Sequence, residues 1–248
     1  MKRYWIAGLL GATLLSHAYA DGPAHWSYTG SHDARHWAEL DQNFATCKLG
    51  KVQSPINILT KSAEKAALPA IGFAYSAGAA EVINNGHTIQ VNLPAAGKAS
   101  FDGVDYQLLQ FHFHTPSEER INGKAYPLVA HLVHKNVDGK LAVVAVLFKL
   151  GKENTALKSV FNTLPAKEGD KTALDGMLNP SDMLPADATY YAFMGSLTTP
   201  PCSEEVRWQV LKTPVEISKT QLAQFKKLYR MNARPVQPLN GRKVQVSQ

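Results

Sequence analysis

The sequence has 248 residues, with 26 basic and 20 acidic side chains and a formal net charge of +6. Its basic residues are scattered, and the densest group lies on and just after a predicted amphipathic helix: Lys226, Lys227, Arg230 and Arg234. That pattern is typical of a solvated helix face, so the charge predicts neither a nucleic-acid partner nor a membrane partner.

The first twenty residues have the features of a secretory signal peptide. Lys2 and Arg3 precede an apolar run over residues 4–15, and the small-residue triplet Ala18-Tyr19-Ala20 follows. The apolar run is shorter than the ~20 residues that a membrane-spanning helix needs. We therefore expect cleavage after residue 20 and export to the periplasm. Residues 21–248 contain no linker or internal repeat, which predicts a single soluble domain.

The two cysteines, Cys47 and Cys202, both lie in the exported part of the chain. An oxidising compartment favours a disulfide between them. Zinc ligation is the alternative, but neither cysteine has a cysteine or histidine partner at zinc-finger spacing. A bridge across 155 positions would stabilise the fold by about 4–5 kcal/mol in the chain-entropy model.

Most of the periodic signal has the period of two that is typical of a strand with one buried face. Residues 87–93 and 205–210 alternate in this way, whereas residues 141–148 are nearly all apolar and predict a strand buried on both faces. Helices are predicted around residues 157–164 and from Ser218, where Ser-Lys-Thr-Gln forms a capping box. The expected fold is a β-dominated α+β domain with peripheral helices.

Residues 106–114 are the most informative predicted strand. Because side chains alternate along a strand, Gln110, His112 and His114 point to one side. Two imidazoles at this spacing can reach one metal ion. Alternating histidines also occur on polar strand faces, so spacing alone leaves both interpretations open.

Residues 128–134 predict another strand, on which His131 shares a face with Val129 and Val133. His134 has the opposite parity and points away from that face. If this strand neighbours the previous one, His131 completes a site of three imidazoles with an open fourth position. That pattern is typical of catalytic zinc.

The order and spacing of several motifs resemble those of the alpha-class carbonic anhydrases over essentially the whole exported chain. These motifs are His25-Trp26-Ser27-Tyr28, Gln53-Ser54-Pro55-Ile56-Asn57, Asn84-Asn85-Gly86-His87, Gln110-Phe111-His112-Phe113-His114, Ser117-Glu118, His131-Leu132-Val133-His134, Ser196-Leu197-Thr198-Thr199-Pro200-Pro201 and Asn232-Ala233-Arg234-Pro235-Val236-Gln237-Pro238-Leu239. The cysteine positions resemble the disulfide of exported members of the family.

The resemblance implies a large twisted, mostly antiparallel central sheet and the zinc-dependent, reversible hydration of carbon dioxide to bicarbonate and a proton. It implies that the Zn²⁺ ligands are His112, His114 and His131. In this family zinc lowers the pKa of its bound water, so that hydroxide is available near neutral pH. Anions and sulfonamides are the inhibitors that the resemblance predicts, and it admits a homodimer.

Further roles also follow from the resemblance. The Thr198 hydroxyl would accept a hydrogen bond from the nucleophile and donate one to Glu118, because a hydroxyl that donates to a carboxylate can only accept elsewhere. His87 would be the proton shuttle, since an imidazole titrates near neutral pH. The implied substrate-binding residues are Val133, Val143, Leu197, Thr198, Thr199, Val206 and Trp208, and the implied solvent network is Tyr28, Asn85, Gln90 and Thr199. The Ser54-Pro55 and Pro200-Pro201 bonds are expected to be cis.

One departure from the family concerns the partner of His131. Many members have a glutamate two residues before the third ligand and a histidine after the relay glutamate, where this chain has Val129 and Glu119. By resemblance, Gln110 accepts a hydrogen bond from the His112 ring, and the backbone carbonyl of Asn232 accepts one from the His114 ring. We hypothesise that Glu119 accepts from His131, directly or through one water. In the alternative, Glu119 is a solvated loop residue and water alone serves His131.

Two other functions fit the sequence less well. A zinc hydrolase of the metallo-β-lactamase kind needs Asp-His directly after His-x-His, and Thr115-Pro116 stands there instead. A non-enzymatic binding module built on the same fold predicts the loss of a ligand histidine, whereas all three are present. The sequence therefore favours the lyase.

Overall fold

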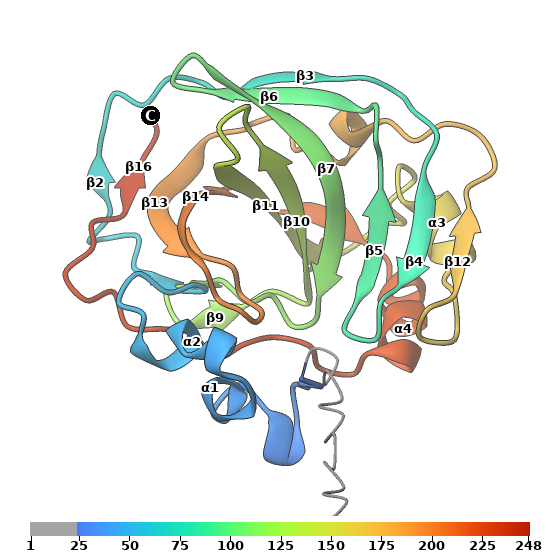
Figure 1. Cartoon of the computed structure of the whole chain (residues 1–248). Coiled ribbons are helices and arrows are strands. Elements are labelled where there is room, and N and C mark those ends of the chain that lie inside the picture. The colour runs from blue at the N-terminus through green and yellow to red at the C-terminus, as the bar shows by residue number, and fades with distance from the viewer. Residues whose placement is uncertain (1–23) are drawn as a thin grey trace, which may run out of the picture.

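The computed structural model describes residues 24–248, so the predicted signal peptide over residues 1–20 lies outside the described residues. A strongly curved sheet of 13 strands dominates this part of the chain (Figure 1). Its main path runs in space through β12 (Lys171–Ala173), β4 (Glu81–Asn84), β5 (Ile89–Asn92), β7 (Val104–His114), β10 (Leu128–Lys135), β11 (Leu141–Leu150), β14 (Glu204–Leu211), β13 (Tyr190–Ser196), β16 (Gln245–Val246) and β2 (Glu64–Lys65).

The remaining elements surround this path. Three strands branch from it: β3 (Gly72–Tyr75), β6 (Gly97–Phe101) and β15 (Val215–Ile217). A small separate sheet comprises β1 (Asn57–Ile58), β8 (Arg120–Ile121) and β9 (Lys124–Ala125). The α-helices are α1 (Trp37–Leu40), α2 (Thr46–Leu49), α3 (Lys158–Asn162) and α4 (Lys219–Leu228), and the 3₁₀ turns are η1 (Gly30–His32), η2 (Gln42–Phe44) and η3 (Pro180–Met183).

Most neighbouring strands of the large sheet are antiparallel, which confirms the expected fold class. The parallel pairs are β11–β14, β11–β15 and β16–β2. The predicted strands over residues 87–93, 106–114, 128–134, 141–148 and 205–210 all form, and they include the centre of the sheet. In the described part of the chain, no helix is both long and apolar enough to cross a membrane.

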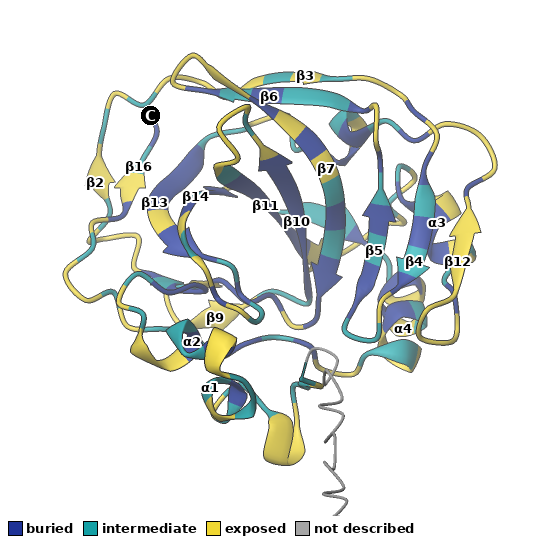
Figure 2. Ribbon diagram, in the orientation of Figure 1, coloured by how far each residue is buried: buried dark blue, intermediate teal, exposed yellow. Residues whose placement is uncertain are grey.

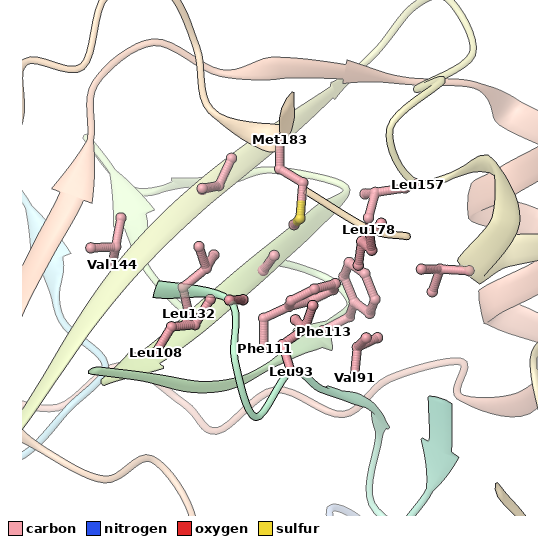
Figure 3. Close-up of a cluster of buried hydrophobic side chains, with 14 of the residues drawn as sticks. Val91, Leu93, Leu108, Phe111, Phe113, Leu132, Val144, Leu157, Leu178 and Met183 are labelled. Carbon is pink, nitrogen blue, oxygen red and sulfur yellow. The ribbon is translucent and has the colours of Figure 1, made fainter. Parts of the chain in front are cut away.

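The central strands are buried on both faces, as Figure 2 shows for β10 and β11. One face carries Phe111, Phe113 and Leu132, which are fully buried in a cluster with Leu157 and Met183 (Figure 3). The ring of Phe113 lies 5.5 Å from that of Phe161 in α3 and 5.9 Å from that of Phe225 in α4. Each such side chain contributes ~1.5–3 kcal/mol through burial, so this face fixes the central strands in place.

Both predicted helices form, as α3 and α4, whereas the short helices α1 and α2 were not predicted. Ser218 begins α4 with a capping box: its hydroxyl accepts from the Gln221 amide at 3.1 Å, and its own amide donates to the Gln221 side chain at 3.2 Å. The predicted helix around residues 157–164 is shorter in the structure, because it ends at Asn162.

The N-terminal segment forms a small aromatic core of its own. Trp37, Phe44, Cys47 and Cys202 are buried together, and Trp26 packs against them. Cys47 and Cys202 form the expected disulfide. The bridge joins α2 to the loop that follows β13, so it ties the N-terminal segment to that loop.

His134 is fully buried on the side of β10 opposite to His131, as its parity predicts. Its Nδ1 lies 3.3 Å from the Ala142 carbonyl, which can only accept, so this nitrogen carries the proton. Its Nε2 therefore accepts from the Tyr75 hydroxyl, at 2.6 Å. Burial lowers the pKa of His134 to about 4, whereas the backbone carbonyls of Ala142 and Leu132 raise it less.

We expect His134 to make the fold sensitive to acid. Its folded pKa of about 4 lies below the ordinary value of 6.5, so the unfolded chain takes up this proton first. The stabilisation is complete above pH 6.5 and is lost as the pH falls toward 4. Between pH 7.5 and 4.5, urea unfolding of the zinc-free wild type should lose ~2–3 kcal/mol more than that of His134→Gln. An equal loss in the two proteins would contradict this expectation.

Candidate metal centre and active site

The register between β7 and β10 brings three histidines together. His131 lies directly opposite His112 in this antiparallel pair, and Val129 lies opposite His114. The three rings are 4.8–5.5 Å apart between centroids. One nitrogen from each ring can be chosen so that all three lie within 4.8 Å of one another. The predicted cluster therefore forms from side chains of two neighbouring strands.

Each ring uses its other nitrogen in a hydrogen bond. His112 Nδ1 donates to the Gln110 side-chain oxygen at 2.9 Å, and His114 Nδ1 donates to the Asn232 carbonyl at 2.6 Å. His131 Nε2 donates to the Glu119 carboxylate at 3.1 Å. These contacts fix the tautomers, because the acceptors carry no proton to give. They leave Nε2 of His112, Nε2 of His114 and Nδ1 of His131 as the unprotonated nitrogens.

This donor set fits zinc. His114 Nε2 is buried and has no hydrogen-bond partner among residues 24–248, as a metal-ligating nitrogen would. Burial is the main reason that the pKa of His112 falls to about 3 and that of His114 falls well below its ordinary value. Both rings are therefore neutral, which metal ligation requires. Three neutral imidazoles are the ligand set of catalytic zinc sites.

Two buried carboxylates lie beside the cluster. Glu118 Oε2 is 3.5 Å from His114 Nε2 and 3.8 Å from His131 Nδ1, and Glu119 touches the opposite side of His131. Burial lowers the pKa of His131, but Glu119 and then Glu118 raise it more, so the net shift is upward. The carboxylates thus create a negative potential at this site, which also favours a bound cation.

The backbone around residue 234 holds Glu118. The Arg234 amide donates to Glu118 Oε1 at 2.7 Å. Burial raises the pKa of Glu118 to about 7, while His131, the Thr198 hydroxyl and the Arg234 amide oppose that rise. The buried Arg234 guanidinium donates to the carbonyls of Cys47 and Ser54 and to Gln53, at 2.7–2.9 Å. It therefore fastens the residue-234 segment to the disulfide-bonded region.

The loop after β13 presents Thr198 and Thr199 to the cluster. Thr198 is buried, and its hydroxyl lowers the pKa of Glu118. The Cys202 amide donates to the Thr199 carbonyl at 2.8 Å, and the Leu197 amide donates to Ser203 at 2.9 Å. These bonds close the loop tightly. The Ser54-Pro55 and Pro200-Pro201 bonds are cis as expected, and Thr115-Pro116 is cis as well.

A cleft of about 170 Å³ leads to the histidines. His112, His114, Val133, Leu197 and Thr199 line it together with Trp26, Tyr28, Asn85, His87, Thr88, Gln90 and Gln110. Of the predicted substrate-binding residues, Val143, Thr198, Val206 and Trp208 are not among those that line this cleft. Val143, Val206 and Trp208 are buried in the apolar cluster that contains Val133 and against which Leu197 packs, so they support the wall from behind.

His87 lies at the mouth of the cleft. Its ring stacks on Trp26 with centroids 3.6 Å apart and planes 7° from parallel. Asn85 fixes the turn, because its side-chain oxygen accepts from the His87 and Thr88 amides at 3.0 and 2.9 Å. The Asn85 side chain also donates to Gln90 at 3.4 Å. Burial lowers the pKa of His87, and the Glu168 carboxylate opposes this shift.

Asn232 connects the metal ligands to His87. Its carbonyl accepts from His114, and its side-chain amide donates to the His87 carbonyl at 3.1 Å and to the Phe113 carbonyl at 2.9 Å. Its side-chain oxygen accepts from the Thr115 amide at 2.8 Å. One fully buried residue thus sets the position of a metal ligand and of the cleft mouth.

A larger surface hollow of about 460 Å³ lies over β13 and β14, but its charged side chains are already engaged. Arg207 pairs with Asp102 and Lys243 pairs with Glu64. Arg242 donates to the carbonyls of Met194, Gln53, Leu239 and Pro238. Among residues 24–248, the histidine cluster that can hold a metal ion lies in the other cleft, so that cleft is the site of chemistry.

Comparison with known proteins agrees with this geometry. A family model described as eukaryotic-type carbonic anhydrase matches residues 32–248. The chain belongs to the alpha-class carbonic anhydrases. A carbonic anhydrase of Pectobacterium carotovorum is 43% identical over 91% of this chain and 92% of its own length. One of Klebsiella pneumoniae is 46% identical, and the match covers 89% of this chain and 90% of that protein.

A solved structure is also similar. The complex of alpha-carbonic anhydrase from Thermovibrio ammonificans with sulfanilamide is 48% identical and has a TM-score of 0.88, with 90% of this chain and all of that chain covered. Alpha carbonic anhydrases use zinc to hydrate carbon dioxide reversibly, and the histidine cluster supplies the metal site for that reaction. The chain is therefore a zinc-dependent lyase.

Two functional contacts escaped the sequence interpretation. Trp26 appeared in a family motif without a role, and its stacking on His87 has no signal in sequence spacing. The charge pattern places Arg234 among solvated basic residues, but only 3% of its surface is exposed. Its position between Pro235 and a run of apolar and amide residues, away from the face of α4, was the available signal.

Replacing a ligand should remove the metal. In His114→Ala the cluster keeps two imidazoles, so zinc affinity should fall by more than the ~10–100-fold that loss of an outer hydrogen-bond partner causes. Competition with a chromogenic chelator measures the affinity, and carbon dioxide hydration should be lost with it. His32→Ala, at an exposed histidine, is the matched control and should retain zinc. Full zinc occupancy in His114→Ala would contradict the ligand assignment.

Proposed function

We propose that this site hydrates carbon dioxide with Thr198 and Glu118 orienting the nucleophile and with His87 exporting the proton. The observation that carries the proposal is the set of three histidines whose outer nitrogens are all hydrogen-bonded. His112, His114 and His131 would hold zinc, which when bound would supply a nucleophile near neutral pH by lowering the pKa of water. Residues of this chain orient the nucleophile, bind the substrate and transfer the proton.

Thr198 determines which way the nucleophile points. Its hydroxyl has one proton, and it lowers the pKa of Glu118 as a hydrogen-bond donor to that carboxylate would. A hydroxyl that donates to a carboxylate can only accept from the attacking oxygen. That oxygen then directs a lone pair away from Thr198 and toward the substrate. Such fixed orientation lowers the barrier because the reacting groups need no further search.

The apolar side of the cleft suits carbon dioxide. Val133 and Leu197 line it, and Val143, Val206 and Trp208 fill the space behind them. Carbon dioxide makes almost no hydrogen bonds, so it loses little by leaving water for this wall. Thr199 lines the same cleft, and a backbone amide of the Thr198-Thr199 segment would receive the developing bicarbonate oxygen.

His87 is the proposed proton acceptor because it is the titratable group at the cleft mouth. Tyr28, Asn85, Gln90 and Thr199 line the space between it and the histidine cluster. Burial and Glu118 raise the pKa of Tyr28, so its hydroxyl stays protonated and orders water as a neutral group. Water ordered by these side chains would carry the proton to the His87 ring.

Removing the imidazole of His87 should slow turnover without impairing hydration itself. In His87→Ala, kcat measured by stopped flow should fall by about 100-fold, at the lower end of the 10²–10⁴-fold range of general acid–base assistance. The value of kcat/KM should change little, because proton export follows carbon dioxide hydration. Millimolar imidazole should restore kcat. Equal loss in both parameters, without rescue, would count against the role of His87.

Glu119 is the proposed partner that holds His131 in the ligating orientation. It is fully buried, its Oε2 accepts from His131 Nε2, and its Oε1 has no partner among the described residues. Val129 lies on the same face of β10 and carries no acceptor. A carboxylate in this place makes the imidazole a stronger ligand because it stabilises positive charge on the ring.

Weakening this carboxylate should loosen the metal. Glu119→Gln keeps the shape and an acceptor but removes the charge, so zinc release into excess chelator should become ~10–100-fold faster. Adding Val129→Glu should recover part of the retention. Glu205→Gln, an exposed carboxylate elsewhere, is the control. Unchanged zinc release in Glu119→Gln would dispose of this role and leave the family assignment intact.

The proposal also covers inhibitor binding and export. An aryl sulfonamide or a small anion would bind at the same centre, and the similar Thermovibrio ammonificans structure contains sulfanilamide. Residues 1–20 would direct the chain to the periplasm and be removed, leaving residues 21–248 as one catalytic domain. The Cys47–Cys202 disulfide supports an oxidising destination.

A further inference from the structure

An acidic loop lies against the turn that carries His87. Glu168, in the segment between α3 and β12, packs so closely on Gly86 that a Cβ added there would lie 2.5 Å from both its Cδ and its Oε1. Gly86 has a φ of +82° and directly precedes His87. The Glu168 carboxylate therefore lies over the backbone from which the imidazole projects.

Asn84 holds this arrangement in place. The Gly169 amide donates to the Asn84 carbonyl at 2.8 Å, and the Asn84 amide donates to the Asp170 carbonyl at 3.0 Å. The buried Asn84 side chain donates to the Pro165 carbonyl at 3.0 Å and accepts from the Gly86 amide at 3.1 Å. The acidic loop and the His87 turn thus share one anchor, so the carboxylate stays near the imidazole.

The charge of Glu168 is not neutralised by a neighbour. No lysine, arginine or histidine nitrogen lies within 4.0 Å of its carboxylate in the part of the chain that the structure describes. The Glu168 charge acts on two neighbouring groups. It raises the pKa of His87, and it is the second cause, after burial, of the raised pKa of Tyr229. The other titratable group facing His87 is His25, whose ring lies 6.4 Å away and lowers the pKa of His87.

We propose that Glu168 is a positioning residue that favours the protonated form of His87 and thereby sets the rate at which protons leave the active site. This inference rests on the proposed role of His87 as proton acceptor. Partial burial lowers the pKa of His87, which makes the imidazole a weaker base and a poorer proton acceptor. A carboxylate held nearby offsets that tendency and keeps the imidazole effective near neutral pH, where proton transfer is most efficient.

The test measures the His87 titration in the zinc enzyme by proton NMR, with its signal assigned from its absence in His87→Ala. Glu168→Gln should lower the pKa of His87 by ~0.3, and Glu168→Lys by about twice that amount. Both shifts should shrink in 1 M salt, since screening weakens an exposed charge. Asp175→Asn removes another exposed carboxylate from the same region and should leave the His87 titration unchanged.

Stopped-flow kinetics complete the test. The pH at which the His87-dependent part of kcat is half-maximal should fall by the same amount as the NMR pKa in both Glu168 variants. An unchanged NMR pKa in both variants, or an equal shift in Asp175→Asn, overturns the inference. A pKa shift with no shift in the kcat profile overturns it through the proposed function instead, because His87 would then not export protons.

Discussion

The active site depends on one register between two strands. His131 lies opposite His112 because β10 and β7 pair antiparallel in a fixed alignment. A slip of one residue would turn His131 to the other face of the sheet, where Phe111 and Leu132 now pack. That face is filled by apolar side chains and covered by α3 and α4. The hydrophobic core therefore fixes the geometry of the metal ligands on the opposite face.

Charge balance explains the groups around the ligands. Three neutral imidazoles bring no charge to offset a divalent ion, and burial makes an isolated ion costly. Glu118 and Glu119 supply two carboxylates, on opposite sides of His131. Each is tied to the protein: Glu118 by the Arg234 amide and Glu119 by His131. The site is thus prepared to hold a dication.

Much of this arrangement follows from sequence periodicity. The alternation over residues 106–114 and 128–134 predicts which histidines share a face, and it also places His134 correctly on the other one. Contacts between distant segments have no such signal. Arg234 reaches the Cys47 carbonyl across 187 positions, and the stacking of Trp26 on His87 depends on how the N-terminal segment folds over the sheet. The family resemblance named Asn232, but its bond to the His87 carbonyl required the structure.

The aromatic core of the N-terminal segment separates the mouth of the active site from its floor. Trp26 and Tyr28 line the cleft and pack on the cluster of Trp37 and the disulfide. The three histidines at the floor come from β7 and β10. Natural variation in the first part of the chain can therefore reshape access for substrates and inhibitors while the metal chemistry beneath stays the same, which makes this segment the place to engineer selectivity.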